Sequence, residues 1–445
     1  MSKTKFIIPT LALSALAISQ AEAAKNKLKG SKANIIFIFA DDWGYGDLSA
    51  HGHKGLTTPN LDKMISEGTE FTQFNVCSPV SSSSRTAVMT GHFPSRHGVH
   101  AHFVKTSKYN AKRKMPDWLD PEVVLLPRLL QQAGYKTAHY GKWHLGETPD
   151  APEPKEYGYN DTRVFSGRGP QIPNGPEGYK SAHWTEHCVD NVINFITENK
   201  NEPFFINLWI HESHKDIDPT PEMLEEFYPN LKGPQRPYYT VISSADQHIG
   251  RVMNSLKELG LDDNTLVIFS SDNGPAPYKH PAGETAGLKG RKRSLFEGGV
   301  KTPFIVRMPG FVPKGKVDAS TLVASVDLLP TFCSMAGVKL PEGYIGDGED
   351  ITNLLTGKKY TRTKPVLQYW QENSVGDNWP RLSAKDNKWK LVCNFDMTRV
   401  ELYDYLNDWA EENNLAEKYP QEVERLAKLA FDYYKTLDVK SNKTK

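Results

Sequence analysis

The stretch NIIFIFADDWGYGD, residues 34–47, decides the fold class of this chain. After Asn34 it is apolar without a break to Ala40, which is typical of a strand buried on both faces of a parallel sheet. Asp41, Asp42 and a glycine-rich turn follow directly. Because open α/β sheets bind ligands at the carboxyl ends of their strands, the stretch predicts a central strand that ends at a functional site.

Three more apolar runs have the same character and occupy residues 136–140, 204–210 and 265–270. Helical patterns lie between them, with apolar residues at helical spacing in residues 245–256 and a shorter helix over residues 126–133. Strands that alternate with helices indicate an α/β fold in which helices cover both faces of one sheet.

Polar residues also follow each of these three runs. These residues can bind anions, metals or protons. In the order of the three runs, they are Lys142 and His144, His211 and His214, and Asp272 and Asn273. Each group taken alone is also compatible with a turn or a solvated loop. Together with the first stretch, they supply a set of hard oxygen ligands that suits Ca²⁺ or Mg²⁺ rather than zinc, namely Asp41, Asp42, Asp272 and Asn273.

The composition and the start of the chain narrow the class of protein. Lysine and arginine total 54 and aspartate and glutamate 53 in 445 residues, so no basic surface for nucleic acid is expected. Residues 1–24 combine early lysines, an apolar run and closing alanines, which predicts a signal peptide and export to the periplasm or beyond. A membrane anchor is the alternative, but the apolar run is short for one, and no later segment is long and apolar enough to span a bilayer.

The sequence changes character from about residue 365. Residues 388–395 and 401–405 predict short antiparallel strands, and the apolar residues of 423–434 predict a final amphipathic helix. We therefore expect a catalytic domain over residues 25–364 and a smaller C-terminal subdomain over residues 365–445. The scattered cysteines indicate neither a disulfide scaffold nor a zinc site, although export would permit disulfides; they are Cys77, Cys188, Cys333 and Cys393.

The stretch VCSPVSSSSRTAVMTG, residues 76–91, contains one thiol and several hydroxyls ahead of Arg85. A run of serines is most often a solvated loop. Residues 84–89 can form a helix that stops at Gly91, which would place Ser81 just before a helix N-terminus that favours an anion. With Arg85 as a fixed positive group, these residues favour a metal-assisted hydrolase of an anionic ester.

Blocks along nearly the whole chain after residue 24 resemble the type I sulfatases of the alkaline-phosphatase-like superfamily. The blocks are ADDWGYGDLSAHG, TPNLD, FTQF, SRTAVMTGHFPSRHGV, LLQQAGYKTAHYGKWHLG, SSDNGP, SLFEGGVKTPFIVRMPG and ELYDYLNDWAEENNLA. The resemblance implies an α/β, alkaline-phosphatase-like sandwich with a large mixed central sheet flanked by helices. It also implies a smaller C-terminal antiparallel sheet with a helix, and sulfatase activity. The predicted signal peptide and a serine-type site favour a sulfated host or algal glycan as the substrate class.

The family's catalytic motif begins with a cysteine or serine that a maturation enzyme converts to formylglycine (3-oxoalanine). The motif continues to Ser-Arg and closes on Thr-Gly, and counting back from Arg85 identifies Ser81 as the modified residue. If Cys77 were the first residue of the motif, Ser-Arg would come four residues later than the family's spacing requires, so Cys77 is interpreted as structural. Ser83 stands where the family usually has proline or alanine. The hydrate of formylglycine has two hydroxyls, one to attack sulfur and one to release sulfate, and a plain serine lacks the second.

The resemblance also implies the other roles in the site. One calcium ion would be held by Asp41, Asp42, Asp272, Asn273 and Ser81. Arg85 and Lys142 resemble the groups that hold the hydrate, and Lys142 and Lys292 those that bind sulfate. His144 is the expected base, and His214 is expected to contact the substrate and donate a proton to the leaving alcohol.

Two other functions compete with this interpretation. The first is a phosphatase or phosphodiesterase of the same superfamily, which would use an unmodified serine and two transition metals held by several histidines and aspartates. The second is a binding protein that has lost catalysis. Under the sulfatase interpretation, the aromatic and basic residues around Trp379 and Arg381 predict a substrate-contacting loop in the C-terminal subdomain.

Overall fold

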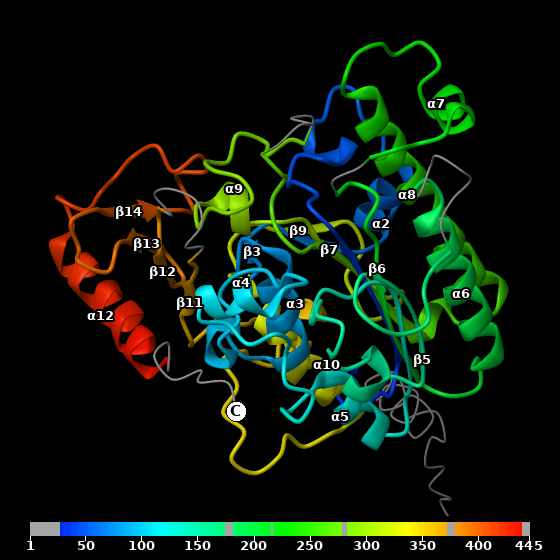
Figure 1. The fold of residues 1–445 in the computed structure, drawn as a ribbon, viewed down its shortest axis with the longest axis horizontal. Helices are drawn as coiled ribbons and strands as arrows, with labels where there is room; N and C mark the ends of the chain where they lie inside the picture. The colour runs from blue at the N-terminus through cyan, green and yellow to red at the C-terminus, as the bar shows by residue number, and fades with distance from the viewer. Residues whose placement is uncertain (1–26, 174–180, 215–216, 278–282, 372–378, 438–445) are drawn as a thin grey trace, which may run out of the picture.

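The computed structural model describes residues 27–173, 181–214, 217–277, 283–371 and 379–437 (Figure 1). The predicted signal peptide, residues 1–24, lies outside the described residues. The main sheet has eight strands in the order β5-β4-β6-β1-β7-β8-β2-β9. These strands are β5 (Asp161–Phe165), β4 (Lys136–Lys142), β6 (Phe204–Trp209), β1 (Asn34–Ala40), β7 (Thr265–Ser271), β8 (Phe304–Arg307), β2 (Thr69–Phe71) and β9 (Lys316–Asp318).

The four strands predicted from the sequence are neighbours in the middle of this sheet. β4, β6, β1 and β7 run parallel, with Ile36 of β1 opposite Ile206 of β6 and Val267 of β7. β8 is antiparallel to β7 and to β2, so the sheet is mixed, as predicted. The carboxyl ends of the four parallel strands therefore meet at one edge of the sheet.

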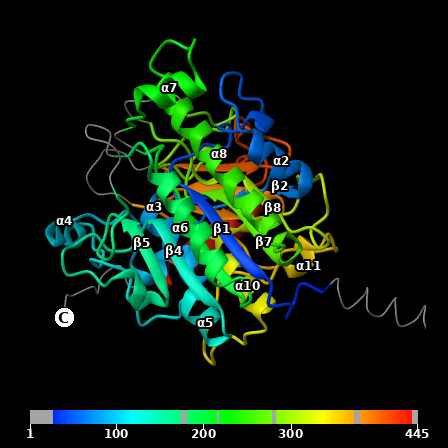
Figure 2. The same cartoon turned by 90° about the vertical axis from the view of Figure 1, so that its right-hand side faces the viewer.

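Helices cover both faces of the sheet because the side chains of β1 alternate between two cores. Ile35, Phe37 and Phe39 belong to one apolar cluster, and Ile36 and Ile38 belong to the other. Each fully buried side chain of this size contributes about 1.5–3 kcal/mol to folding. The second cluster is covered by α2 (Pro59–Glu67), α6 (Trp184–Glu198) and α8 (Arg236–Glu258), which cross in front of the strands in Figure 2. The first is covered by α3 (Ser81–Thr90), α5 (Leu126–Gln132), α10 (Leu328–Ala336) and α11 (Thr352–Leu355).

Shorter elements complete the larger part of the molecule. They are β3 (Phe74–Asn75) paired with β10 (Val323–Ala324), and the helices α4 (Ser107–Lys112), α7 (Pro221–Phe227) and α9 (Glu297–Val300). Single 3-10 turns occupy Ser49–His51, Pro94–His97, Pro154–Tyr157, Asp262–Asn264 and Ser325–Asp327.

A second sheet follows, on the left in Figure 1. It is antiparallel and consists of β11 (Val366–Tyr369), β12 (Leu382–Lys385), β13 (Trp389–Cys393) and β14 (Val400–Asp404), and α12 (Pro420–Thr436) packs on it. The sequence predicted β13, β14 and the helix but not β11 and β12. The domain boundary at residue 365 stays a prediction, although the second sheet begins close to it.

The structure differs from the sequence-based expectations in one helix start. α3 begins at Ser81 rather than at Ser84, so Ser81 is the first residue of the helix and not the residue before it. Gly91 ends the helix in a left-handed conformation, as expected. All four cysteines lie in the described part of the chain and are buried free thiols. No helix in that part is long and apolar enough to cross a bilayer.

Candidate active site

The carboxyl ends of the central strands bring the predicted oxygen ligands together. Asp41 and Asp42 follow β1 directly, and Asp272 and Asn273 follow β7 directly. One carboxylate oxygen from each of the three aspartates lies within 4.8 Å of the others, and all three side chains are buried. The backbone N–H of Asp42 also donates to Oδ1 of Asp272 at 3.2 Å.

Two lysines neutralise two of these aspartates. Lys142, the last residue of β4, places Nζ 2.6 Å from Oδ2 of Asp41. Lys292 places Nζ 2.6 and 2.7 Å from the two carboxylate oxygens of Asp42. Each lysine thus pairs with one of two neighbouring aspartates, and the two cations offset part of the negative charge of the cluster.

Arg85 on α3 neutralises the third aspartate and is completely buried. Its Nη2 donates to Oδ2 of Asp272 at 2.7 Å. The guanidinium lies over the rings of Trp209 and Phe39, at 4.8 and 5.4 Å from their centroids. Its Nε and Nη1 atoms have no hydrogen-bond partner among the described residues, so these two donors are available to bind an anion.

Ser81 lies at the centre of this arrangement. Its Oγ donates to Oδ1 of Asp41 at 3.1 Å and lies 3.2 Å from Nζ of Lys142. As the first residue of α3, Ser81 is also surrounded by backbone N–H groups that lack partners within the helix and favour negative charge. The predicted modified residue therefore meets the acidic cluster and a cation at one helix terminus.

The other serines of the run have different surroundings. The Oγ of Ser82 accepts from the backbone N–H of Phe103 at 2.9 Å, and the Oγ of Ser83 donates to the carbonyl of Ala101 at 3.1 Å. The buried Oγ of Ser84 has no partner in the described part of the chain. Only Ser81 directs its hydroxyl to the aspartates.

His144 lies two residues beyond Lys142 in a left-handed conformation, with φ of 57°. Its Nε2 is 3.2 Å from the carbonyl of Phe103, so this nitrogen carries the proton, and the buried Nδ1 has no partner among the described residues. Burial, together with Lys142, His102 and Arg85, holds the pKa of His144 well below its usual value. A neutral imidazole with an open Nδ1 lone pair results.

Two histidines follow β6 on the same edge of the sheet. The ring of His214 stacks on that of His211 at 4.8 Å, and Nε2 of His214 lies 3.8 Å from Oδ2 of Asp42. His211 contacts Oδ2 of Asp41 through Nδ1. Both histidines were predicted to lie at this edge of the sheet, but only His214 was assigned a role. His102, whose ring lies 6.4 Å from that of His144, was missed.

The charges within the cluster act on one another strongly. Burial alone would raise the pKa of Asp41, but Lys142, His214 and His211 hold it well below its usual value. For Asp272, burial and the Asp41 carboxylate raise the pKa, and Arg85 opposes the shift without cancelling it. Three carboxylates so close together are unfavourable unless positive charge lies between them.

The side chains fit a hard divalent cation. Carboxylate oxygens from three aspartates converge, and the buried Oδ1 of Asn273 has no partner among the described residues, while its Nδ2 donates to Asp42 at 2.7 Å. Oxygen-only ligands of this kind suit Ca²⁺ or Mg²⁺. A second possible group contains Asp41, His211 and His214, with donor atoms also within 4.8 Å of one another.

A sequence model of the Sulfatase family matches residues 33–338, well over half of the chain. This chain belongs to the sulfatase family. A second model, for the C-terminal part of N-sulphoglucosamine sulphohydrolase, matches residues 289–433. Both the acidic cluster and the serine run lie within the first match.

This sulfatase is similar to characterised enzymes over most of its length. It is 28% identical to the N-acetylgalactosamine-6-O-sulfatase of Bacteroides thetaiotaomicron, over 91% of this chain and 93% of that protein. It is 31% identical to arylsulfatase A of Bos taurus, over 74% and 68% of the two chains. Sulfatases are sulfuric ester hydrolases, so the predicted enzyme class is confirmed.

Solved structures share its fold. Ps i-CgsB in complex with k-i-k-neocarrahexaose superposes with a TM-score of 0.80 at 25% identity, over 92% of this chain and 94% of that one. The PsFucS1 sulfatase from Pseudoalteromonas sp. superposes with a TM-score of 0.76 at 23% identity, over 98% and 96% of the two chains. The predicted alkaline-phosphatase-like fold is thereby confirmed.

The turn that carries Asp272 and Asn273 is pressed against α9 of this sulfatase. A Cβ on Gly274 would lie 1.8 Å from the carbonyl oxygen of Gly298, so only glycine fits there. The backbone N–H of Gly274 donates to Gly299 at 3.0 Å. On the other side of the site, a Cβ on Gly141 would lie 2.0 Å from the carbonyl oxygen of Trp209, which explains how β4 approaches β6 so closely before Lys142.

Glu297, five residues after Lys292, anchors this region to the C-terminal sheet. Its buried carboxylate lies 3.2 Å from Lys301, 2.9 Å from Lys385 of β12 and 2.8 Å from Lys390 of β13. Burial would raise the pKa of Glu297, but these three lysines hold it well below its usual value. These charged groups therefore join α9 to the C-terminal sheet.

The two residues of the predicted substrate-contacting loop, Trp379 and Arg381, pack on different aromatic rings. The ring of Trp379 packs against Phe296 at 6.3 Å, next to the loop that ends in Glu297, and Arg399 lies over it at 4.1 Å. Arg381 lies over the ring of Phe395 at 5.7 Å, within the C-terminal sheet. Trp379 therefore packs on Phe296, four residues after Lys292, whereas Arg381 packs on a residue of the subdomain.

Proposed function

We propose that this sulfatase hydrolyses a sulfate ester on a saccharide, with a nucleophile generated at Ser81. The single observation that supports the proposal most strongly is the environment of Ser81. Its hydroxyl is held between Asp41 and Lys142 at the start of a helix, within a cluster of three buried aspartates and three buried cations. Such a cluster is suited to an anionic group and a metal ion together.

Two groups would complete the site when bound or formed. Formylglycine made from Ser81 would supply a hydrated aldehyde as nucleophile, and one Ca²⁺ held by Asp41, Asp42, Asp272, Asn273 and residue 81 would supply positive charge for the sulfate oxygens. Formation of the aldehyde requires a transient partner, a formylglycine-generating maturation enzyme. The unpartnered Oδ1 of Asn273 supports the assignment of the ion.

The cations would bind and orient the sulfate. Lys142 lies beside the oxygen of residue 81, and Lys292 lies against Asp42. Arg85 cannot move far, because two aromatic rings and Asp272 fix its guanidinium. These groups oppose the negative charge that the sulfuryl oxygens carry in the transition state, which is usually the largest contribution to catalysis of this kind.

The two predicted histidines would move protons. His144 is neutral with an open Nδ1, so it can accept a proton from the hydroxyl at residue 81. His214 is 29% exposed, more than the aspartates or Lys142, so a substrate can contact it. We assign the base to His144 and the proton donor to His214. Burial lowers the pKa of His214 well below its usual value, so the negative charge of a bound sulfate ester would have to raise it for this role.

The substrate class is a sulfated sugar. Support comes from relatives named N-acetylgalactosamine-6-sulfatase in several mammals and N-acetylgalactosamine-6-O-sulfatase in Bacteroides thetaiotaomicron. We propose a 6-sulfated N-acetylhexosamine within a host or algal glycan. Trp379, which packs beside the Lys292 loop, and Arg381 remain our candidates for contacts to the sugar. We also keep the prediction that the enzyme is exported.

The proposal is tested by measuring sulfate release from N-acetylgalactosamine 6-sulfate, N-acetylglucosamine 6-sulfate and 4-nitrophenyl sulfate. The enzyme is produced together with a serine-type maturation enzyme and supplied with calcium. We expect turnover of the aryl sulfate and of at least one sugar sulfate. Hydrolysis of bis(4-nitrophenyl) phosphate or 4-nitrophenyl phosphate alone would contradict the proposal.

A phosphoesterase that uses transition metals is the second candidate, and one observation favours it. Donor atoms of Asp41, His211 and His214 lie within 4.8 Å of one another, and such a mixed set suits zinc better than calcium. Metal analysis separates the two functions, since two zinc ions per chain would support the phosphoesterase and one calcium ion the sulfatase.

A further inference from the structure

Outside the aspartate cluster, a cavity of about 340 Å³ is lined by residues 51–55 together with Gly46, Tyr239, Glu284 and Ala286. Its volume falls within the range of small-molecule sites. Two of its walls belong to segments that begin or end in the active site. Gly46 follows Asp42 by four residues, which is at most about 14 Å of extended chain. The wall that contains Glu284 and Ala286 continues to Lys292.

The walls of this cavity are held together by hydrogen bonds. The backbone N–H of Gly46 donates to the carbonyl of Glu284 at 2.9 Å, and the N–H of Glu284 donates to Oδ1 of Asp47 at 2.8 Å. A Cβ on Gly55 would lie 2.9 Å from the ring of Tyr239, so this glycine allows the loop to rest against the ring. The cavity is therefore preformed.

Two rings of the cavity have fixed orientations. Nδ1 of His53 accepts from the backbone N–H groups of Gly55 and Leu56 at 3.1 and 2.8 Å, so the ring proton is on Nε2. Burial lowers the pKa of His53, which keeps the ring neutral. It stands at 89° to the ring of Tyr239, with centroids 5.0 Å apart. Fixed aromatic rings offer apolar area to the C–H groups of a ligand at little cost in entropy.

The charged groups of the cavity balance one another. Glu284 supplies a carboxylate that accepts hydrogen bonds from hydroxyls, and Lys54 supplies an ammonium that donates them. His51, which also lines the cavity, is paired with Glu70 at 2.6 Å. The sulfate of a sulfated sugar would be repelled by the Glu284 carboxylate. The cavity therefore fits an uncharged, polyhydroxylated ligand.

We infer that this cavity binds an unsulfated sugar residue of the same saccharide chain whose sulfated residue occupies the active site. The inference rests on the proposed function for the identity of the chain. Because both walls continue into the active site, an oligosaccharide of a few residues can occupy both places. The enzyme then prefers a sulfated oligosaccharide over the sulfated monosaccharide.

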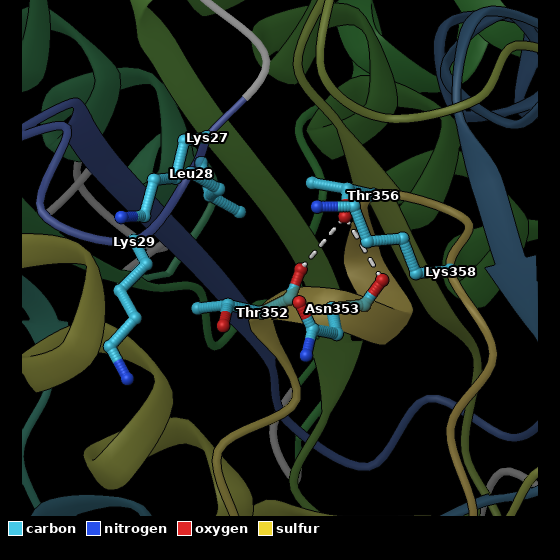
Figure 3. A pocket seen from close by; sticks show the side chains of 7 residues that line it. All are labelled: Lys27, Leu28, Lys29, Thr352, Asn353, Thr356 and Lys358. Atoms are coloured by element: carbon cyan, nitrogen blue, oxygen red, sulfur yellow. Dashed lines mark hydrogen bonds between the residues drawn. The ribbon is translucent and has the colours of Figure 1, made fainter. Parts of the chain in front are cut away.

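A second cavity of about 210 Å³ provides a contrast and a control (Figure 3). It is lined by Lys27, Lys29 and Lys358 with three polar residues and one leucine, and it contains no aromatic ring. Figure 3 shows Lys27 and Lys29 on one side and Lys358 on the other, with the amine of Lys29 pointing away from Lys358. The amines do not converge on a ligand position.

The test compares two substrates with matched variants of the matured enzyme. Sulfate release is measured from N-acetylglucosamine 6-sulfate and from a keratan tetrasaccharide with a single 6-sulfate, whose other residues are uncharged. Tyr239→Ala and Glu284→Gln are expected to raise KM for the tetrasaccharide about tenfold, which corresponds to about 1.4 kcal/mol. KM for the monosaccharide should not change. Tyr239→Phe keeps the ring, and Lys358→Ala alters the other cavity, so both should behave as wild type.

Binding is measured separately from turnover by calorimetry with an unsulfated tetrasaccharide of N-acetyllactosamine units, which carries no charge. Wild type should bind it and Tyr239→Ala should not, even if the substrate of the active site differs from our proposal. Equal losses on both substrates, or unchanged kinetics and binding in both variants, would overturn the inference. Failure of wild type to release sulfate from any sugar, with tetrasaccharide binding intact, would contradict the proposed function and leave the sugar site standing.

Discussion

The Nζ atom of Lys142 lies 3.2 Å from the Oγ atom of Ser81, and both groups contact the carboxylate of Asp41. The end of β4, the end of β1 and the start of α3 therefore meet at one hydroxyl. Among the four serines of residues 81–84, this environment belongs to Ser81, since the other hydroxyls face the 101–103 backbone or have no partner in the described part of the chain.

Ser81→Ala should abolish sulfate release, because no nucleophile can then form at this position. Cys77→Ala and Ser82→Ala should retain most activity, at a stability cost of about 1 kcal/mol for the lost Ser82 hydrogen bond. Cys77 is buried, and burial raises the pKa of its thiol to about 12, so it stays protonated and unreactive. Mass spectrometry of the peptide that contains residue 81 should show the loss of two hydrogens from active enzyme. The same loss located at Cys77 would show that the modified position is wrong.

Asn273→Ala should weaken the response to calcium. We expect calcium to raise the apparent Tm of wild type, as any ligand does that binds only the folded state, and a chelator to reverse the rise and remove activity. Asn273→Ala removes an unpartnered oxygen and should reduce both effects. Asn394→Ala, which also removes a buried oxygen without a partner but in the C-terminal subdomain, is the matched control. An identical calcium response in wild type and Asn273→Ala would exclude Asn273 as a ligand.

Removal of Asp272 is a poorer test of the metal. Its carboxylate is the partner of the completely buried Arg85, at 2.7 Å. A substitution that leaves a buried charge without its partner costs about 3–5 kcal/mol. Asp272→Ala should therefore lower the stability as well as the activity, and the two losses could not be separated.

His214→Ala should affect substrates according to their leaving group. Loss of a proton donor lowers the rate by about 10²–10⁴ when the leaving group is a poor one, such as a sugar alcohol. A 4-nitrophenyl leaving group needs no proton, so the rate on 4-nitrophenyl sulfate should fall far less. His248→Ala removes another histidine with a lowered pKa, on α8 and in contact with Arg251, and should behave as wild type on both substrates. Equal losses on the two sulfates in His214→Ala would remove the proton-donor role.

Much of the site could be predicted because apolar strands followed by polar residues are a local pattern. Asp41, His214 and Asp272 lie just beyond such strands, Lys142 is the last residue of one, and one sheet edge brings them together. The start of α3 was missed because Ser82 and Ser83 are stabilised there by the distant 101–103 segment, which the local sequence does not reveal.

The missed strand β12 has a related cause. Its last residue is Lys385, and a buried lysine breaks the apolar pattern by which a strand is recognised. The charge is tolerated because Nζ of Lys385 lies 2.9 Å from Glu297, which is 88 residues away in the sequence, and 2.7 Å from Oδ1 of Asn75. Pairing at that sequence separation is determined by the tertiary fold.

Lys385 also makes the stability of the enzyme depend on pH. Burial, which Glu297 only partly offsets, lowers the pKa of Lys385 from the usual 10.5 to about 7 in the folded protein. Between pH 7 and 10.5 the unfolded chain holds a proton that the folded chain has released. The free energy of unfolding therefore rises with pH in this range, by at most about 1.4 kcal/mol per pH unit from this group, and the contribution is lost as the pH falls through 7.

Lys385→Met should remove this dependence, because methionine does not titrate and matches the apolar stem of lysine. The apparent midpoint of urea unfolding is measured at several values between pH 6 and 10 for wild type and variant. We expect the stability of wild type relative to Lys385→Met to increase from pH 7 upward. Lys390→Met is the control: Lys390 contacts both Glu297 and Glu411 at 2.8 Å, its pKa is raised, and its removal should destabilise the enzyme at every pH. The difference in stability between wild type and Lys385→Met could instead stay constant or shrink as the pH rises. That result would show that Lys385 keeps its proton in the folded enzyme, and Glu297 would then be surrounded by three charged lysines.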